Sequence, residues 1–222
     1  MRLYIIGCEY SGTTTLAVGI HRWAQKAMGA DLGLIHDHWK IPDVVAHYPD
    51  RLSKQEHKQV LGLSTRLLES YMRHNLYYHT PHESAVNDDN ITIGHYIEDT
   101  IYARLYYQYG GPQQPGDREI HSKKIESIIM NLAPETVLLH IRADEEVIAR
   151  RMKDALHPYP VVPEEDIDRV SRLFSAAFHA SRIGNKMEID TSHDSPETSV
   201  DQFVSKVQPF LTRLDRERLA VQ

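Results

Sequence analysis

The residues best suited to chemistry lie near the start of the chain, where a short apolar run leads into a turn bounded by two glycines. The turn and the start of the next segment comprise Gly7, Glu9, Tyr10, Ser11, Gly12, Thr13, Thr14 and Thr15. Glycine permits positive backbone torsions, so successive N–H groups of such a turn can converge on one anion. A helix that begins directly afterwards adds the positive end of its dipole. We therefore expect these residues to bind a phosphate group.

One position departs from the usual phosphate-loop pattern of glycine, any four residues, glycine, lysine, then serine or threonine. Gly7, Gly12 and Thr14 match the pattern, and the Thr14 hydroxyl stands where such loops ligate magnesium. Thr13 stands where lysine is usual. Removing one preorganised charge of this type raises a reaction barrier by on the order of 3 kcal/mol. A chain that transfers phosphate with this loop therefore needs a substitute cation.

The composition limits the class of protein. With 222 residues and 41% hydrophobic content, the chain suits a single α/β domain, residues 1–222. The formal net charge of -6 argues against general affinity for nucleic acid or an anionic membrane, whereas a small anion needs only a local basic cluster. Cys8 is the single cysteine, so an intrachain disulfide is excluded. No signal-peptide pattern or membrane-length apolar run is present, and we expect a cytoplasmic protein.

The elements that must position the loop alternate between short β-rich runs and helical patterns. The β-rich runs predict strands over residues 3–6, 32–39, 91–97, 136–141 and 186–190. Helical spacing predicts helices over residues 14–28, 53–79 (one helix or a pair), 98–109, 120–132, 145–156, 164–181 and 196–214. Such alternation favours a three-layer α/β/α fold with a doubly wound, parallel, five-stranded sheet.

Asp37 lies at the carboxyl end of the second predicted strand. Open α/β sheets place their ligand crevice at that edge, beside the loop that follows the first strand. The flanking His36 and His38 share a face of the strand while Asp37 points away, so the three do not converge easily on one metal ion. His74 and His79 are five residues apart, which does not suit a helical zinc pair. We therefore expect no structural zinc.

With these elements placed, the whole chain resembles small P-loop kinases of the nucleoside and nucleotide kinase group, which includes thymidylate and deoxynucleoside kinases. The order and spacing of the elements match over nearly all 222 residues. Asp37 stands where that group has an acidic residue that acts as base or binds the acceptor, and Trp39 is a further likeness. The group's acidic-Arg-Ser/Tyr motif lacks its arginine here, where the equivalent stretch is His95-Tyr96-Ile97-Glu98-Asp99.

The resemblance implies a P-loop NTPase fold of the nucleotide kinase type and a set of roles. ATP would be the donor, Thr14 would hold Mg²⁺, and a nucleotide or other small-molecule acceptor would bind a helical region at about residues 40–82. Asp37 or Glu98 would accept the acceptor's proton, and Asp99 would orient a magnesium-bound water. The resemblance leaves room for a homodimer.

The segment from Val137 to Met152 is similar to the strand, acidic turn and arginine-bearing helix that lead into the lid of these kinases. The lid itself would span about residues 150–165. Its cations would stabilise the charge on the transferring phosphoryl group and are Arg150, Arg151 and Lys153. Any of them, or Lys123 and Lys124, could replace the missing loop lysine.

Two alternatives come from other classes of protein. The loop is also similar to the Ser-Gly-Thr-Thr loop of sulfotransferases, which lacks the lysine and binds the phosphosulfate of the donor PAPS. In that comparison Tyr10 replaces a basic residue, Arg142 fits a second signature, and Arg150 stands where that signature has serine. The missing lysine also suits a nucleotide-binding regulatory protein without catalysis.

Overall fold

The computed structural model describes residues 1–45, 47–49, 51–83, 89–114 and 116–221. Its strands are β1 (Arg2–Ile6), β2 (Ile35–His36), β3 (His47–Tyr48), β4 (Asn90–Ile93), β5 (Val137–Arg142) and β6 (Asn185–Asp190). Within the described residues they form one sheet in the order β3-β2-β4-β1-β5-β6. Five strands run parallel, and β3 pairs antiparallel with β2. The predicted five-stranded parallel sheet is confirmed, with a two-residue strand added at its edge.

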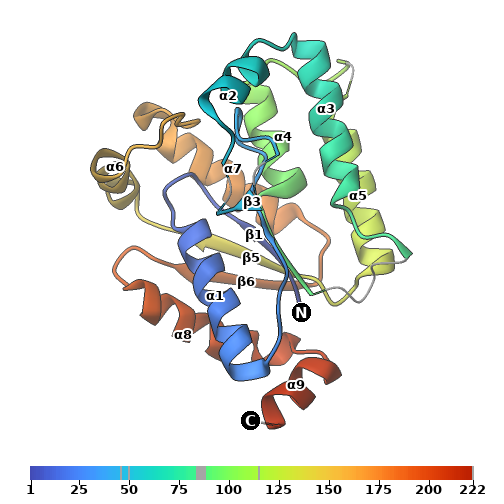
Figure 1. Cartoon of the computed structure of the whole chain (residues 1–222), viewed down its shortest axis with the longest axis vertical. Coiled ribbons are helices and arrows are strands. Elements are labelled where there is room, and N and C mark those ends of the chain that lie inside the picture. Colours follow the sequence, from blue (N-terminus) through green and yellow to red (C-terminus); the bar gives the residue numbers. More distant parts are fainter. Residues whose placement is uncertain (46, 50, 84–88, 115, 222) are drawn as a thin grey trace.

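Helices cover both faces of the sheet (Figure 1). They are α1 (Thr13–Met28), α2 (Lys54–Leu61), α3 (Thr65–Tyr78), α4 (His95–Leu105), α5 (Arg118–Leu132), α6 (Glu145–Asp154), α7 (Ile167–Ala180), α8 (Pro196–Val207) and α9 (Arg213–Ala220), with 3-10 turns at Glu164–Asp166 and Gln208–Phe210. The packed pair α1 and α8 lies on one face, and α3, α4, α5 and α7 lie on the other. No helix in the described part of the chain has the length and apolarity needed to cross a membrane.

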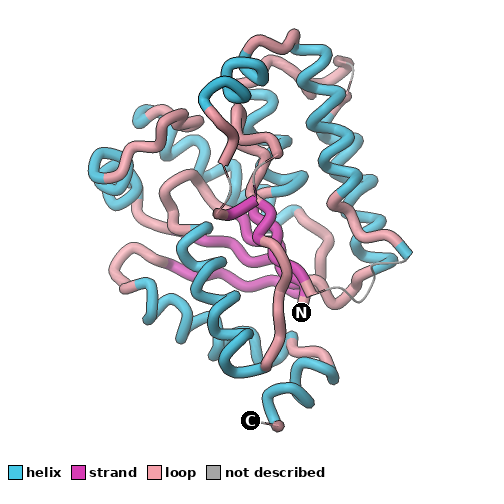
Figure 2. Tube along the Cα trace, in the orientation of Figure 1, coloured by secondary structure: helices cyan, strands magenta, loops and turns pink. Residues whose placement is uncertain are grey.

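Strand β1 shows how the core is built. Leu3 and Ile5 pack into the apolar cluster beneath α1 and α8, whereas Tyr4 and Ile6 pack into the cluster beneath α4 and α7. Successive side chains of a strand point to opposite faces, so a strand covered on both faces is apolar at nearly every position. Figure 2 shows the strands enclosed between the two helical layers. This arrangement is the predicted three-layer fold.

The order of the strands determines where a ligand can bind. β1 lies between β4 and β5, so the loop that leaves its carboxyl end emerges at the middle of the sheet edge. The loop that follows β2 emerges at the same edge, because β2, β4 and β1 are parallel. In open α/β sheets this edge carries the ligand crevice.

The structure differs from the sequence predictions mainly at the ends of elements. The predicted strand over residues 32–39 is reduced to β2 because Gly33 has a φ of 68° and its N–H bonds the Asp31 carboxylate at 3.0 Å. The strand predicted over 91–97 ends at Ile93, because Gly94 with a φ of 79° starts α4 directly. Of the predicted long helices, 53–79 is the pair α2 and α3, and 196–214 ends as an α-helix at Val207.

Candidate active site

The phosphate loop joins β1 to α1, as the sequence predicts. Gly12 is the N-cap residue of α1 and has a φ of 100°, a conformation that favours glycine. A β-carbon on Gly7 would lie 2.6 Å from both the Ile141 carbonyl oxygen and the Ser11 hydroxyl oxygen, so only glycine fits there. The first turn of α1 has no side-chain cap and no acidic residue. Its first N–H groups have no acceptor within the helix, which makes this end of α1 suited to an anion.

A cavity of about 850 Å³ adjoins the loop. Several predicted site residues line it, namely Glu9, Tyr10, Gly12, Thr13, Thr14, Thr15, Asp37 and Arg151. On one side of the loop the cavity extends over the segment from Asp37 to His57, and on the other it reaches the turn before α8 at Asp194. It therefore has room for a ligand on each side of a phosphate held at α1. Gly7 and Ser11 belong to the loop but do not line the cavity. The Ser11 N–H donates to the Cys8 carbonyl oxygen at 3.0 Å.

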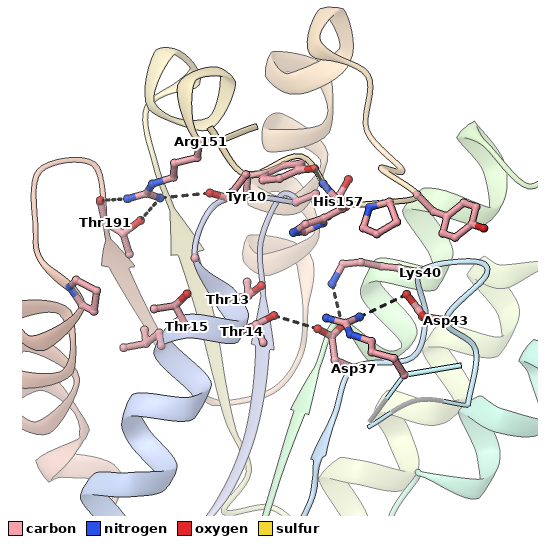
Figure 3. Close-up of a pocket in the computed structure, with 18 of the residues that line it drawn as sticks. Tyr10, Thr13, Thr14, Thr15, Asp37, Lys40, Asp43, Arg151, His157 and Thr191 are labelled. Carbon is pink, nitrogen blue, oxygen red and sulfur yellow. Dashed lines mark hydrogen bonds and ion pairs between the residues drawn. The ribbon is translucent and has the colours of Figure 1, made fainter. Parts of the chain in front are cut away.

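A chain of polar contacts joins the loop to the end of β2 (Figure 3). The Thr14 hydroxyl donates to one Asp37 carboxylate oxygen at 3.0 Å, and the Lys40 ammonium donates to the other at 2.8 Å. Thr14 and Asp37 thus present two adjacent oxygens of the kind that Mg²⁺ prefers. Lys40 was not predicted as a site residue, yet it brings a cation into the cavity beside the loop that lacks its lysine.

Burial and pairing set the charges of this group. Burial alone would raise the pKa of the Asp37 carboxyl, but the Lys40 ammonium and the hydrogen bonds from Lys40 and Thr14 hold that pKa below its ordinary value. Burial opposes the charge of Lys40, but the Asp37 and Glu98 carboxyl groups outweigh it and raise the Lys40 pKa. At neutral pH the pair is therefore a carboxylate and an ammonium ion.

Glu98 lies behind this pair, in the first turn of α4, and is fully buried. One carboxyl oxygen is 3.6 Å from the Lys40 ammonium nitrogen, and neither oxygen has a hydrogen-bond partner in the described structure. Burial, opposed in part by Lys40, raises the pKa of Glu98 to about 8. Glu98 is near the predicted base Asp37 but does not line the cavity.

Side chains of the phosphate loop contact the predicted lid, residues 150–165. The buried Glu9 carboxylate lies 2.9 Å from the His157 Nδ1 atom and accepts the N–H groups of Val161 and Val162 at 2.8 and 3.0 Å. The Tyr10 hydroxyl accepts the His157 N–H at 2.9 Å, and the two rings stack with centroids 4.3 Å apart. Glu9 and Tyr10 thus contribute side-chain contacts to the lid.

The three predicted lid cations lie in different surroundings. The Arg151 guanidinium donates to the Tyr10 and Ser11 carbonyl oxygens, each at 3.3 Å, and to the Thr191 carbonyl oxygen at 2.7 Å. Those contacts hold the shape of the loop. Arg150 is exposed outside the cavity, and Lys153 pairs with Glu164 at 2.7 Å.

Asp99 follows Glu98 in sequence but belongs to a different part of the structure. Its carboxylate accepts hydrogen bonds from the Arg118 guanidinium and from the Tyr109 hydroxyl at 3.0 Å. Arg118 also pairs with Glu69 at 2.8 Å, which joins α3, α4 and α5 in a buried network. The structure does not bring Asp99 to the cavity or to Thr14, so its expected role beside magnesium has no geometric support. Lys123 and Lys124 also lie away from the cavity, on α5.

The strand order and the loop before α1 define the fold as that of P-loop nucleoside and nucleotide kinases. A deoxyadenosine kinase from M. mycoides with bound dATP has a TM-score of 0.60 at 16% identity, over 94% of this chain and 100% of that one. The thymidylate kinase from Candida albicans has a TM-score of 0.57 at 14% identity, over 94% and 91%. The YorR protein from Bacillus subtilis, in complex with phosphorylated GDP, has a TM-score of 0.55 at 16% identity, over 96% and 100%. The sequence matches no protein-family model and no curated protein.

Proposed function

We propose that this protein is a magnesium- and ATP-dependent phosphotransferase whose acceptor is a nucleoside, a nucleotide or a similar small molecule. The observation that carries the proposal is the chain of contacts from Thr14 through Asp37 to Lys40, at the end of a helix suited to phosphate. Solved structures with this fold include a deoxyadenosine kinase and a thymidylate kinase, which supports the same class of reaction.

The phosphate loop would hold the donor through the first N–H groups of α1. ATP would supply the phosphoryl group, and Mg²⁺ would spread the negative charge of its phosphates. The Thr14 hydroxyl and the Asp37 carboxylate offer two oxygen atoms 3.0 Å apart beside this helix end. The residues therefore fit the donor and the ion that the fold implies, apart from Thr13.

Lys40 is the cation best placed to replace the missing loop lysine. The Asp37 carboxylate bridges the Lys40 ammonium and the Thr14 hydroxyl, and Lys40 lines the cavity. The Lys40 side chain is partly buried and held by its ion pair, so its charge needs less reorganisation during the reaction than that of a solvated lysine. Asp37 would accept the proton of the acceptor hydroxyl or phosphate, since its carboxylate is ionised at neutral pH.

The acceptor would occupy the part of the cavity over residues 37–57. Among the described residues, polar side chains that line this part include those of Lys40, Asp43, Arg51, Lys54 and His57. The Asp43 carboxylate is 2.8 Å from the His57 ring and 3.4 Å from Arg51, so this wall presents both signs of charge. Such a lining suits an acceptor with hydroxyl groups or a phosphate.

The proposal is tested by thermal-shift and turnover assays with Mg²⁺ and either ATP or PAPS, each against a panel of deoxynucleosides and nucleoside monophosphates. We expect ATP to stabilise the protein and at least one acceptor to produce ADP. Asp37→Asn should lose turnover by about 100-fold or more, because the amide cannot take a proton, while ATP without Mg²⁺ still raises the melting temperature, since the N–H groups of the loop are unchanged. Asp31→Asn, on the exposed turn before the same strand, is the control and should behave as wild type.

Stabilisation by PAPS in place of ATP would favour a sulfotransferase and overturn the proposal. Tight ATP binding without hydrolysis or transfer to any acceptor would favour a regulatory protein. Wild-type turnover by Asp37→Asn would remove Asp37 from the mechanism.

A further inference from the structure

Three histidines converge behind the end of β2. His36 belongs to β2, His38 lies two residues further along the chain, and His79 is the C-cap residue of α3. Their ring centroids are 5.5 Å apart for His36 and His38, 4.6 Å for His36 and His79, and 4.3 Å for His38 and His79. One ring nitrogen from each residue lies within 4.8 Å of the other two.

The sequence predicts only half of this arrangement. His36 and His38 share a side of the strand, and Asp37 points away from them to Thr14 and Lys40. The expectation of no structural zinc considered only histidines close together in the sequence. What the structure adds is a third imidazole, His79, from the far end of a helix that is distant in sequence.

The surroundings of His79 orient its ring toward the other two. The His79 Nδ1 atom lies 2.8 Å from the Asn75 carbonyl oxygen, which can only accept a hydrogen bond. Nδ1 must therefore carry the proton, and the lone pair is left on Nε2. A hydrogen bond from the second ring nitrogen to a carbonyl oxygen is the arrangement that orients histidines bound to metal ions.

The His38 ring is buried, and its contact with the Val45 backbone falls short of normal hydrogen-bond geometry. Its exposed fraction is 4%, and neither ring nitrogen makes a hydrogen bond of normal geometry in the described structure. A buried imidazole always carries at least one polar N–H or lone pair that costs free energy unless it is satisfied. The Trp39 ring closes the far side of the cluster, with its centroid 4.6 Å from that of His38 and 5.6 Å from that of His79.

We propose that His36, His38 and His79 bind a divalent transition-metal ion, with zinc as the best fit to an all-imidazole set. Imidazole nitrogens suit zinc, copper, nickel and cobalt, whereas Mg²⁺ prefers oxygen ligands, so this site is separate from the magnesium site proposed at Thr14. Tetrahedral zinc holds neighbouring nitrogens about 3.3 Å apart, and all three pairs already lie within 4.8 Å, so no pair needs to close by more than about 1.5 Å, which ring rotation can supply. The three protein ligands leave a fourth position for water or an anion.

The protonation states agree with this geometry. Burial, reinforced by the neighbouring His79 and His36 rings, lowers the pKa of His38 to about 3. Burial also lowers the pKa of His79, although the hydrogen bond to Asn75 opposes it. Neutral imidazole is the form that binds a metal ion. A bound ion would join the end of α3 to the strand end that carries Asp37, and so fix the position of Asp37 without touching the substrate.

The test is direct metal binding by the untagged full-length protein, independent of any phosphotransfer activity. We expect one Zn²⁺ per chain by elemental analysis and titration calorimetry, and an intense visible absorption with Co²⁺ as the probe. His36→Gln and His79→Gln should each weaken Zn²⁺ binding by about 10-fold or more, since each removes one ligand. His74→Gln is the matched control, because His74 lies on the same helix, is exposed, and is absent from the cluster.

Thermal melting provides a second readout. Zn²⁺ should raise the melting temperature of the wild type and of His74→Gln, but not that of His79→Gln, because binding to the native state alone stabilises it. Absence of Zn²⁺ and Co²⁺ binding to the wild type at micromolar concentrations would overturn the proposal. So would unchanged affinity in both His36→Gln and His79→Gln. If either variant fails to fold by circular dichroism, the other variant and the wild-type titration still decide the question.

Discussion

In the proposed phosphotransferase, Lys40 would supply the positive charge that Thr13 lacks, from a different part of the sequence. Thr13 lines the cavity from the position where a phosphate loop usually carries lysine, but it offers only a hydroxyl. Lys40 reaches the same cavity from the loop after β2, held by Asp37 at 2.8 Å and with Glu98 at 3.6 Å. The electrostatic requirement of phosphoryl transfer concerns where a charge lies, and its origin in the sequence is irrelevant.

Replacing Lys40 tests this at the scale of the residue. Lys40→Met should reduce turnover by about 100-fold, because a preorganised charge is lost, while ATP affinity changes much less. Lys58→Met is the control, since Lys58 is exposed on α2 and does not line the cavity. The double variant Thr13→Lys/Lys40→Met should recover part of the rate. Steady-state kinetics with a melting curve for each variant provide the measurement, and a wild-type rate in Lys40→Met would exclude the role.

At the scale of elements, the phosphate loop and the lid form one unit. Glu9 is 3% exposed and bonds the lid at three points, and Arg151 at the end of α6 bonds the loop in return. Hydrogen bonds to a buried carboxylate are about twice as strong as those to a neutral acceptor. The loop therefore fixes the position of the predicted lid, residues 150–165.

Neutralising Glu9 should loosen the lid without unfolding the protein. In Glu9→Gln we expect the backbone N–H groups of Val161 and Val162 to exchange with deuterium about fivefold faster, since each loses a charge-assisted acceptor worth about 1 kcal/mol more than an amide oxygen. Glu164→Gln is the control, because Glu164 lies on the same segment and its ion pair with Lys153 is exposed. Equal exchange rates in wild type and Glu9→Gln would show that the carboxylate does not hold the lid.

On the scale of the whole molecule, buried ionisable groups lie among the helices on one face of the sheet, where each charged group must be paired or neutral. Arg118, Asp99 and Glu69 form a satisfied network between three helices. Glu98 is different, because its carboxyl oxygens have no hydrogen-bond partner in the part of the chain that the structure describes. The protonation state of Glu98 therefore affects the free energy of unfolding.

The pH dependence of unfolding should reveal Glu98. Its pKa is raised from 4.5 to about 8, so the native state keeps a proton that the unfolded state releases above pH 4.5. The free energy of unfolding should thus fall as pH rises from about 5 to 8, by at most about 1.4 kcal/mol per pH unit from this group. Urea titrations give the free energies of unfolding of wild type and Glu98→Gln. The wild-type value should fall relative to that of the variant as pH rises. The exposed Glu119→Gln serves as control, and a pH-independent difference between wild type and Glu98→Gln would contradict the raised pKa.

Sequence alone determined the layered fold and the phosphate loop, because both follow from local patterns. Apolar runs such as Leu3–Ile6 specify strands buried on two faces, and Gly7 and Gly12 specify a turn that only glycine can make. The position of Asp37 beside the loop could also be predicted from the sequence, since parallel strands end at one edge of the sheet. Element ends at Gly33 and Gly94 were missed because a positive φ stops a strand regardless of its apolar pattern.

Only the tertiary structure decided which charges and rings meet. Lys40 and Asp37 are three residues apart in an irregular segment, where no periodicity says which side chain faces the cavity. Adjacent residues such as Glu98 and Asp99 enter different surroundings, because side chains one position apart on a helix do not share a face. His79 reaches His36 and His38 through the packing of α3 against the sheet, a contact between distant segments that local sequence cannot encode. The glycine turn of the loop was thus determined locally, whereas the position of Lys40 beside it and the histidine cluster depend on long-range packing.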